Sequence, residues 1–496
     1  MVTLTIGVLI ATLICIALFR SLYQKPHFLA RAQQFLDDAY CWHRFNPNPD
    51  AQTGMFQIRL LDEWRAIVYD KKAITDIFNS SSLLFLPVVS DMFQFSYTMH
   101  PSIGQSPDIH RPYLRFIMSH LDEFLPDMMK EIELTLDARH SENNGQFAVM
   151  DGLTATVFRA LNVVFVGPHL ARDPVFRKET LKAIQSIMGT GSILKFSSSF
   201  ARPFLHKVLN MFMPTCTKAH AMLVNEIRRG KSEISKERCQ WDHRGIDVLT
   251  EFIRGDKLID DENILAFHFI AMTLAGTVTT NPGWLAFILL SEHQTLTAIV
   301  FDLVQQEGCL HRIRKELQAA TSDRGEINAG VLASCPSPDA FLEESLRLCN
   351  LGALPITRRA TKDLTFSNGI RIATGTSLSV PIRWTHCNPE VYPNLETFDD
   401  SRFRDTSGVH KSGVYPHSDP ANPNPNFLFF GYGKYACPGR FLAMRIAKCL
   451  VAHLVLKYDI RWAHPGCVPR PMWVMYYCAP DPKAEVVISR RGLVTR

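Results

Sequence analysis

Several features that would place this chain in a familiar class are missing. Its twelve cysteines contain neither a Cys-x-x-Cys pair nor a regular framework, which argues against a zinc site and a disulfide scaffold and favours a reducing compartment. A formal net charge of +5 is too small to indicate a nucleic-acid partner. The chain has no internal repeat and no strand–helix alternation of the dinucleotide-binding type. What it has is 46% apolar residues, enough for a large core.

Charge is absent from the N-terminal segment Met1–Phe19, and basic residues (Arg20, Lys25) follow it. Such a segment is about long enough to cross a bilayer as a helix. The positive charge after it predicts that the rest of the chain stays on the cytosolic side. A cleaved signal peptide is the alternative, although the segment lacks a basic start and a small-x-small cleavage site. We expect a transmembrane anchor at 1–20, a linker leading into the catalytic region at 21–50, and a catalytic domain at 51–496.

Apolar periodicity dominates the middle of the chain and predicts helices there, whereas short strand-like runs flank it. The expected helices are Tyr113–Ile132, Val175–Ile187, Phe204–Arg228 and Ile264–Thr280. The expected strands lie near Phe56–Tyr69, Leu364–Phe366, Ile370–Ile372 and Ser377–Val380. The predicted fold class is mainly α with small β-sheets.

One cysteine stands in an unusual setting. Phe430, Gly433, Cys437 and Gly439 have the spacing F-x-x-G-x-x-x-C-x-G. Glycines allow the tight turn that would aim a sulfur at a flat ligand, and a helix N-terminus after the cysteine would offer N–H groups to a thiolate. Phe430 could shield the sulfur from water. The alternative is a buried free cysteine in a glycine-rich turn.

At these residues the chain resembles the cytochrome P450 superfamily, whose haem iron is held by a cysteine thiolate. The resemblance extends over nearly the whole chain, with the motifs in the expected order. It implies the cytochrome P450 fold preceded by an N-terminal transmembrane helix, and haem b (iron protoporphyrin IX) with Cys437 as the axial metal ligand. The loop and tail around 435–441 and 479–483 are most similar to fungal membrane-bound enzymes of secondary metabolism, including the ent-kaurene oxidase-like group.

A second motif is Glu344-Ser-Leu-Arg347, in which the acid and the base lie one helical turn apart. Ser337 is expected to cap this helix. Alone, such a pair is an ordinary solvated salt bridge. The resemblance instead implies a structural triad with Arg402, in the segment Phe398–Phe403, that braces the haem-binding loop. Asp400 stands where the family often has proline.

The two haem propionates require cationic partners. The resemblance implies Arg115 and Arg358 as these cofactor-binding residues, with a solvated surface position as the alternative for each. Tyr435 stands where most relatives have Arg or His. A phenol can donate a hydrogen bond to a propionate but adds no charge, so weaker haem retention is expected.

The resemblance also implies an oxygen-facing helix in which Ala275 and Gly276 leave room for dioxygen and Thr279 is the catalytic proton donor. A Thr bonded to its own helix backbone is the alternative. Val278 departs from the acid that the family has there. Residues 282–293, which begin with Pro282-Gly283, interrupt the expected helix and are interpreted as an insertion, either real or retained from an intron.

Function follows from the resemblance and from the mostly apolar walls at 83–95 and 351–356. We expect a haem-thiolate monooxygenase that oxidises C–H bonds of an apolar small molecule, such as a terpenoid, alkaloid or polyketide intermediate of fungal secondary metabolism. The alternatives are non-monooxygenase chemistry (isomerisation, dehydration) and a haem-binding pseudoenzyme. The implied electron source is NADPH through a cytochrome P450 reductase, with cytochrome b5 as an additional candidate, at the endoplasmic reticulum membrane. A reductase docking face is predicted at Lys434, Arg440, Arg445 and Lys448, unless these are simply solvated charges.

Overall fold

The structure is a computed structural model of the 496-residue chain. It describes residues 54–59, 63–104, 111–215, 217–235, 247–254, 261–277, 294–349, 356–404, 420–466, 469–470, 472–474 and 477–492. The predicted anchor at 1–20 and linker at 21–50 lie outside these residues, as do Val278, Thr279 and the predicted insertion 282–293.

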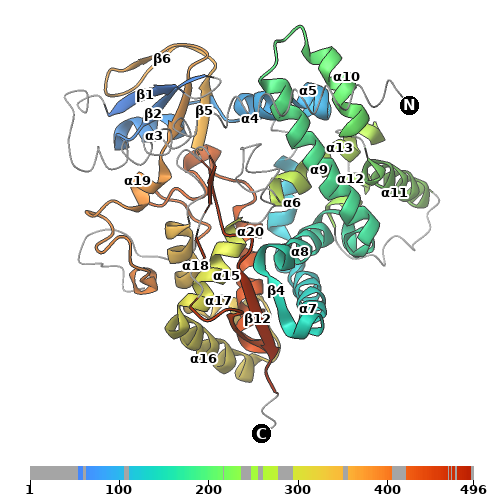
Figure 1. Cartoon of the computed structure of the whole chain (residues 1–496), viewed down its shortest axis with the longest axis vertical. Coiled ribbons are helices and arrows are strands. Elements are labelled where there is room, and N and C mark those ends of the chain that lie inside the picture. Colours follow the sequence, from blue (N-terminus) through green and yellow to red (C-terminus); the bar gives the residue numbers. More distant parts are fainter. Residues whose placement is uncertain are drawn as a thin grey trace.

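Helices make up most of the described chain (Figure 1). The α-helices are α3 (Lys71–Asn79), α4 (Leu86–Phe93), α5 (Phe95–Thr98), α6 (Arg111–Ser119), α7 (Leu125–Ser141), α8 (Val149–Arg172), α9 (Pro174–Lys195), α10 (Arg202–Phe212), α11 (Lys218–Ser235), α12 (Val248–Arg254), α13 (Glu262–Thr277), α15 (Gln294–Gln305), α16 (Glu307–Arg324), α17 (Ala329–Ala333), α18 (Pro336–Leu348), α19 (Ile382–His386) and α20 (Arg440–Lys457). Short 3-10 turns are η2 (Pro101–Gly104), η4 (Asn143–Gly145), η6 (Asp400–Phe403) and η7 (Gly433–Tyr435).

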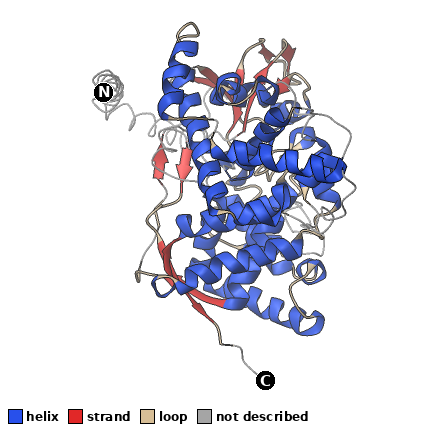
Figure 2. Cartoon of the chain, turned by 90° about the vertical axis from the view of Figure 1, so that its right-hand side faces the viewer, coloured by secondary structure: helices blue, strands red, loops and turns tan. Residues whose placement is uncertain are grey.

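The strands form small sheets at the periphery of the helices (Figure 2). They are β1 (Met55–Arg59), β2 (Trp64–Val68), β3 (Leu83–Leu84), β4 (Gln146–Ala148), β5 (Ile356–Ala360), β6 (Leu364–Thr365), β7 (Arg371–Ile372), β8 (Ser377–Val380), β9 (Tyr458–Trp462), β10 (Met472–Val474), β11 (Tyr477–Ala479) and β12 (Glu485–Arg490). The largest sheet has the order β1-β2-β8-β5-β3, and a second has the order β4-β12-β9. The mainly helical fold class with small sheets is confirmed.

Two large hydrophobic cores and one small cluster hold the described residues together. The larger one surrounds α8 and α20, which bury most of their residues. The smaller one lies between α3 and the five-stranded sheet, where Phe78 packs with Val68 and Leu378. Among the described helices, α8 is long and apolar enough to span a bilayer, but most of its residues are buried inside the protein.

Two of the predicted helices are each divided in two. The predicted helix Tyr113–Ile132 consists of α6 and α7, and Pro126 lies in the first turn of α7. The predicted helix Phe204–Arg228 consists of α10 and α11, with Pro214 between them. Proline has no N–H and clashes with the preceding helical turn, so it ends a helix despite continuous apolar periodicity. The periodicity identified the apolar faces correctly but not these breaks.

The helix that carries the Glu-x-x-Arg motif begins earlier than expected. α18 starts at Pro336, and its N-cap Cys335 makes no side-chain cap, so Ser337 is not the cap residue. The backbone N–H of Ser337 instead donates to Glu316 of α16 at 3.0 Å. A carboxylate from a neighbouring helix thus satisfies an N–H group that local sequence cannot.

Candidate functional site

The segment before Cys437 is anchored in both cores. Phe427 and Phe429 belong to the core around α8 and α20, whereas Leu428 between them belongs to the core of the five-stranded sheet. Side chains that alternate along an extended segment reach opposite sides, so one short stretch links the two halves of the molecule. The Cys437 N–H donates to the Phe430 carbonyl at 2.7 Å and closes the loop. Phe430 itself is half-buried and packs edge-on against Phe429.

The two glycines of the motif have different roles. Gly433 has φ +63°, so its backbone conformation favours glycine, and a Cβ there would lie in contact with the Phe78 carbonyl of α3 at 3.4 Å. Gly439 has φ −85°, and nothing lies within 4 Å of the place where its Cβ would be. The expectation that Gly439 is needed for the tight turn is therefore wrong for its backbone. Its backbone would accept other residues as well.

The sulfur of Cys437 has a polar surround on one side. The N–H groups of Gly439 and Arg440 donate to it at the start of α20. Burial raises the pKa of the thiol, and these N–H groups and the Arg440 charge oppose that rise. Arg440 also binds the backbone, since Nη1 donates to the Cys437 carbonyl at 3.0 Å and Nε to the Ala421 carbonyl at 2.8 Å. Arg440 is thus part of the loop's own support.

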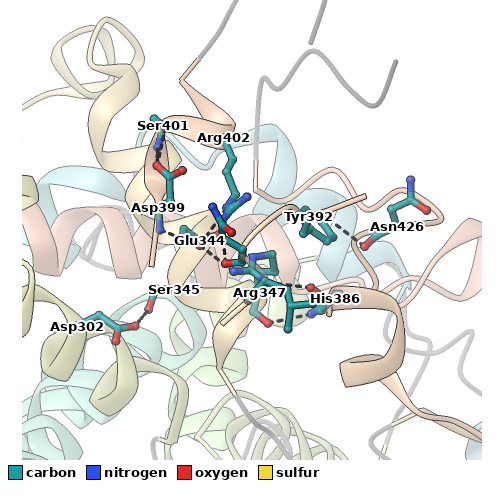
Figure 3. Close-up of polar contacts among 12 residues, drawn as sticks. Asp302, Glu344, Ser345, Arg347, His386, Tyr392, Asp399, Ser401, Arg402 and Asn426 are labelled. Carbon is teal, nitrogen blue, oxygen red and sulfur yellow. Dashed lines mark hydrogen bonds and ion pairs between the residues drawn. The ribbon is translucent and has the colours of Figure 1, made fainter. Parts of the chain in front are cut away.

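The structure brings the predicted triad together (Figure 3). Glu344 and Arg347 are buried and form a two-pronged pair, with Nε and Nη2 of Arg347 donating to the carboxylate at 2.7 and 2.8 Å. Arg402 of η6 lies 3.5 Å from the same carboxylate. The Asp399 N–H adds a fourth contact at 2.9 Å. Burial raises the pKa of Glu344, and these donors oppose the rise, so the solvated-salt-bridge alternative does not hold here.

The triad reaches the cysteine loop through His386, which the sequence did not identify. Nη1 of Arg347 donates to the His386 and Leu395 carbonyls, each at 2.9 Å. The His386 ring stacks on Phe427, and its Nε2 accepts from the Leu428 N–H at 2.9 Å. Burial lowers the pKa of His386 to about 3, so the ring stays neutral. No spacing rule marks His386, because it meets Leu428 only through the fold.

Asp400, the departure from proline, has a visible role. It forms an ion pair with Arg312 of α16 and lies 3.5 Å from Arg404. Asp400 is 4% exposed, so these charges are bound in a protected place. This ion pair ties the turn that carries Arg402 to a neighbouring helix. In the sequence, the only sign of this ion pair is the acid at position 400, where the family often has proline.

Arg358 is a buried cation without an acidic partner among the described residues. It lies on β5, is 5% exposed, and its Nη1 donates only to the carbonyl of Thr357 while its Nε is unpartnered. Burial lowers its pKa to about 10, with a small opposing effect from Tyr435. A desolvated guanidinium is costly unless an anion pairs with it. The site therefore suits an anionic group supplied by a ligand.

The other predicted propionate residues differ from Arg358. Arg115 lies on α6 and is exposed, so the described structure leaves its role a prediction. Tyr435 ends η7, and its ring centroid lies 5.9 Å from the Arg358 guanidinium carbon. Arg358 of β5 thus lies beside Tyr435, and Cys437 follows two residues later, between η7 and α20.

Less of the oxygen-facing side is described. α13 ends at Thr277, and Thr279 and Val278 lie outside the described residues, so the catalytic assignment stays a prediction. Ala275 is exposed on this helix. Gly276 does not face open space, because a Cβ there would lie 3.0 Å from Leu161 of α8. Its role in the described structure is to let α13 and α8 approach closely.

The residues present fit a haem group. They offer a cysteine whose sulfur accepts from two N–H groups, a half-buried phenylalanine whose carbonyl binds the Cys437 N–H, and a buried guanidinium that has no acidic partner among the described residues. Bound haem would supply the one-electron and dioxygen chemistry that side chains lack. Cys437 would be its iron ligand and Arg358 a propionate ligand.

Comparison with known proteins agrees with this geometry. The family model for cytochrome P450 matches residues 108–483. The chain is 22% identical to cytochrome P450 monooxygenase 71 of Postia placenta, over 94% of this chain and 90% of that protein. It is 25% identical to cytochrome P450 monooxygenase pyr3 of Aspergillus fumigatus, over 94% and 86%.

Solved structures share the fold. The cytochrome P450DA heme domain superposes with a TM-score of 0.66 at 13% identity, over 92% of this chain and 94% of that one. Retinoic acid-bound cyanobacterial CYP120A1 gives 0.64 at 20% identity, over 93% and 96%. Together with the Cys437 loop and the buried Glu344 triad, these matches establish that the chain belongs to the cytochrome P450 family of haem-thiolate monooxygenases.

Proposed function

We propose that this monooxygenase oxidises C–H bonds of an apolar small molecule in fungal secondary metabolism, such as a terpenoid, alkaloid or polyketide intermediate. The observation that carries the haem assignment is the buried guanidinium of Arg358, which has no acidic partner among the described residues and lies beside Tyr435, two residues before Cys437. The fungal relatives, among them cytochrome P450 monooxygenase cdmJ of Talaromyces verruculosus at 26% identity, support the metabolic setting. The ent-kaurene oxidase-like group remains a prediction.

Each described residue has a definite task in this proposal. Cys437 holds the iron, and Gly433 shapes the turn that presents its sulfur. Arg358 neutralises a propionate. Glu344, Arg347 and Arg402 touch no substrate and keep the loop in place through His386. Thr279 is proposed as the proton donor.

Electrons are proposed to come from NADPH through a cytochrome P450 reductase, with cytochrome b5 as a second donor. The predicted basic docking face needs revision. Arg440 binds the loop backbone, Arg445 pairs with Asp122 at 2.8 Å, and Lys448 pairs with Asp339 at 2.5 Å. Of these four residues, Lys434 alone is exposed. A reductase would therefore meet a face with less free positive charge than the sequence indicates.

Membrane attachment is proposed on the apolar N-terminal segment, with support from an exposed apolar face near α10. Phe200, Phe204 and Met211 are 87%, 72% and 70% exposed, and α10 buries none of its residues. Large exposed aromatic groups beside basic ones, here Arg202 and Lys207, are typical of surfaces that enter a bilayer interface. Carbonate-resistant sedimentation of the full chain with membranes would support the anchor, and full extraction would contradict it.

The test of the function has two steps on the full-length protein. The reduced carbon monoxide complex is expected to show the thiolate-type Soret band, and Cys437→Ser is expected to lose it. A wild-type protein without this band is the pseudoenzyme. With substrate and reductase, product formation should consume NADPH and oxygen in proportion. Product formed without either identifies the isomerisation or dehydration chemistry that Val278 would tolerate.

A further inference from the structure

Two neighbouring arginines on β5 are treated differently. Arg359 points to one side of the strand and pairs with Glu63 and Asp91 at 3.2 and 3.3 Å. Arg358 points to the other side, is more deeply buried, and has no acid partner among the described residues. Something other than an opposite charge must hold the Arg358 guanidinium in place.

Aromatic rings occupy that position. The Arg358 guanidinium carbon lies 5.4 Å from the ring centroid of Phe85 and 5.9 Å from that of Tyr435. Phe85 is the N-cap residue of α4, and Tyr435 lies two residues before Cys437. Guanidinium groups stack on aromatic faces. The Arg358 side chain is 5% exposed, whereas Phe85 is 50% exposed and covers it from the outer side. Two segments far apart in the sequence therefore converge on the Arg358 side chain.

Two roles for Tyr435 make different demands on its atoms. If the phenol donates a hydrogen bond to a propionate, the hydroxyl matters. If the residue holds Arg358, the ring matters and the hydroxyl does not. The geometry favours the ring, because Arg358 and Lys434 both lie against it, with Lys434 Nζ 5.0 Å from its centroid. No hydrogen bond of the Tyr435 hydroxyl occurs among the described residues.

We propose that Tyr435 is a positioning residue whose ring, together with that of Phe85, fixes the Arg358 guanidinium for its propionate. Where most relatives have a second cation at position 435, this chain has an aromatic ring that holds the one buried cation, Arg358, in place. This inference rests on the proposed haem function. It also predicts that Phe85, on the segment mapped to the substrate-covering wall, contributes to haem retention.

The test measures the rate at which purified holoenzyme loses haem to an excess of haem-free globin. Tyr435→Phe is expected to stay within about twofold of wild type, because it keeps the ring. Tyr435→Leu and Phe85→Leu should lose haem about tenfold faster. In an Arg358→Gln background, Tyr435→Leu should add little, because the group that the ring positions is already gone. Phe200→Leu, an exposed aromatic on another surface, is the control and should match wild type.

The outcomes separate the inference from the function. If Tyr435→Phe loses haem as fast as Tyr435→Leu, and both lose it faster than wild type, the hydroxyl binds the propionate and the proposal is overturned. If both variants match wild type, neither the ring nor the hydroxyl retains haem, which also overturns the proposal. A full Tyr435→Leu effect in the Arg358→Gln background would also overturn it, since the ring would then act without Arg358. A wild-type protein that binds no haem would instead refute the proposed function. Circular dichroism of each variant shows whether it has folded, and Tyr435→Phe preserves the test if the leucine variants fail to fold.

Discussion

Two fully buried carboxylates in this protein each bind two arginines, and they differ in how they are built. Glu344 pairs with Arg347 three residues away on α18 and meets Arg402 across the fold. Glu131 of α7 pairs with Arg159 and Arg172, both from α8. The first cluster supports the cysteine loop, whereas the second joins two helices of the large core.

The difference lies in how far each arginine can reach water. The Arg347 side chain is fully buried, whereas those of Arg159 and Arg172 are 17% and 40% exposed. A buried charge that loses its partner has no substitute, but a part-exposed one can turn to solvent. Loss of a buried acid is therefore expected to destabilise the protein more when the arginine that it neutralises is shielded from water.

The largest effect is expected for Glu344→Gln. It leaves Arg347 charged and buried, so the free energy of unfolding should fall by about 3–5 kcal/mol. Urea unfolding and haem content of the purified protein measure this. Glu142→Gln is the control: Glu142 pairs with Arg139 at the same i,i+3 spacing but on the surface, and its loss should cost under about 1 kcal/mol.

Glu131→Gln breaks the comparison cluster and should cost less, about 2 kcal/mol, because two charge-assisted hydrogen bonds are weakened but both arginines can be rehydrated. Haem content per folded protein should be unchanged, since Glu131 does not touch the cysteine loop. Urea unfolding and haem absorbance measure the two effects. A cost equal to that of Glu344→Gln would show that the exposure of the arginines does not set the difference.

Near neutral pH, the smallest effect is a pH dependence at His386, which joins the Glu344 cluster to the cysteine loop. His386 has a pKa of about 3 in the folded protein, against an ordinary value of about 6.5. Above pH 6.5 the ring is neutral in both states and contributes nothing. As pH falls from 6.5 toward 3, His386 is protonated in the unfolded chain but not in the folded one. The free energy of unfolding therefore falls by about 1.4 kcal/mol per pH unit.

The physical reason is burial, which disfavours the charged ring. The Leu428 N–H also donates to His386 Nε2, so a proton on that nitrogen would face another N–H. Urea unfolding at pH 7, 6 and 5 tests this. In His386→Asn, the free energy of unfolding should fall less steeply with decreasing pH, because one proton fewer is taken up on unfolding. The part of the slope that is due to His453, whose pKa burial lowers to about 4, should remain. An unchanged slope in His386→Asn would contradict the assignment.

Much of the fold and part of the site could be predicted from the sequence. Apolar periodicity located α9 and α13, and alternation with turn signals located β8. Apolar periodicity does not predict the breaks at Pro126 and Pro214, because the apolar residues keep their helical spacing across each proline. The motif spacing also does not show that Gly439 has an ordinary φ of −85°, because spacing carries no backbone angles.

The sequence by itself determined contacts between residues that lie a few positions apart in the chain. These are the pair of Glu344 with Arg347 on one helical face, and the contact of Cys437 with the first N–H groups of α20. Helix geometry and chain connectivity fix such contacts before the rest of the protein folds. The tertiary structure alone decided the rest. It buried Arg358 without an acid and placed Phe85 and Tyr435 beside it. Burial and the approach of distant segments are properties of packing, which local sequence does not encode.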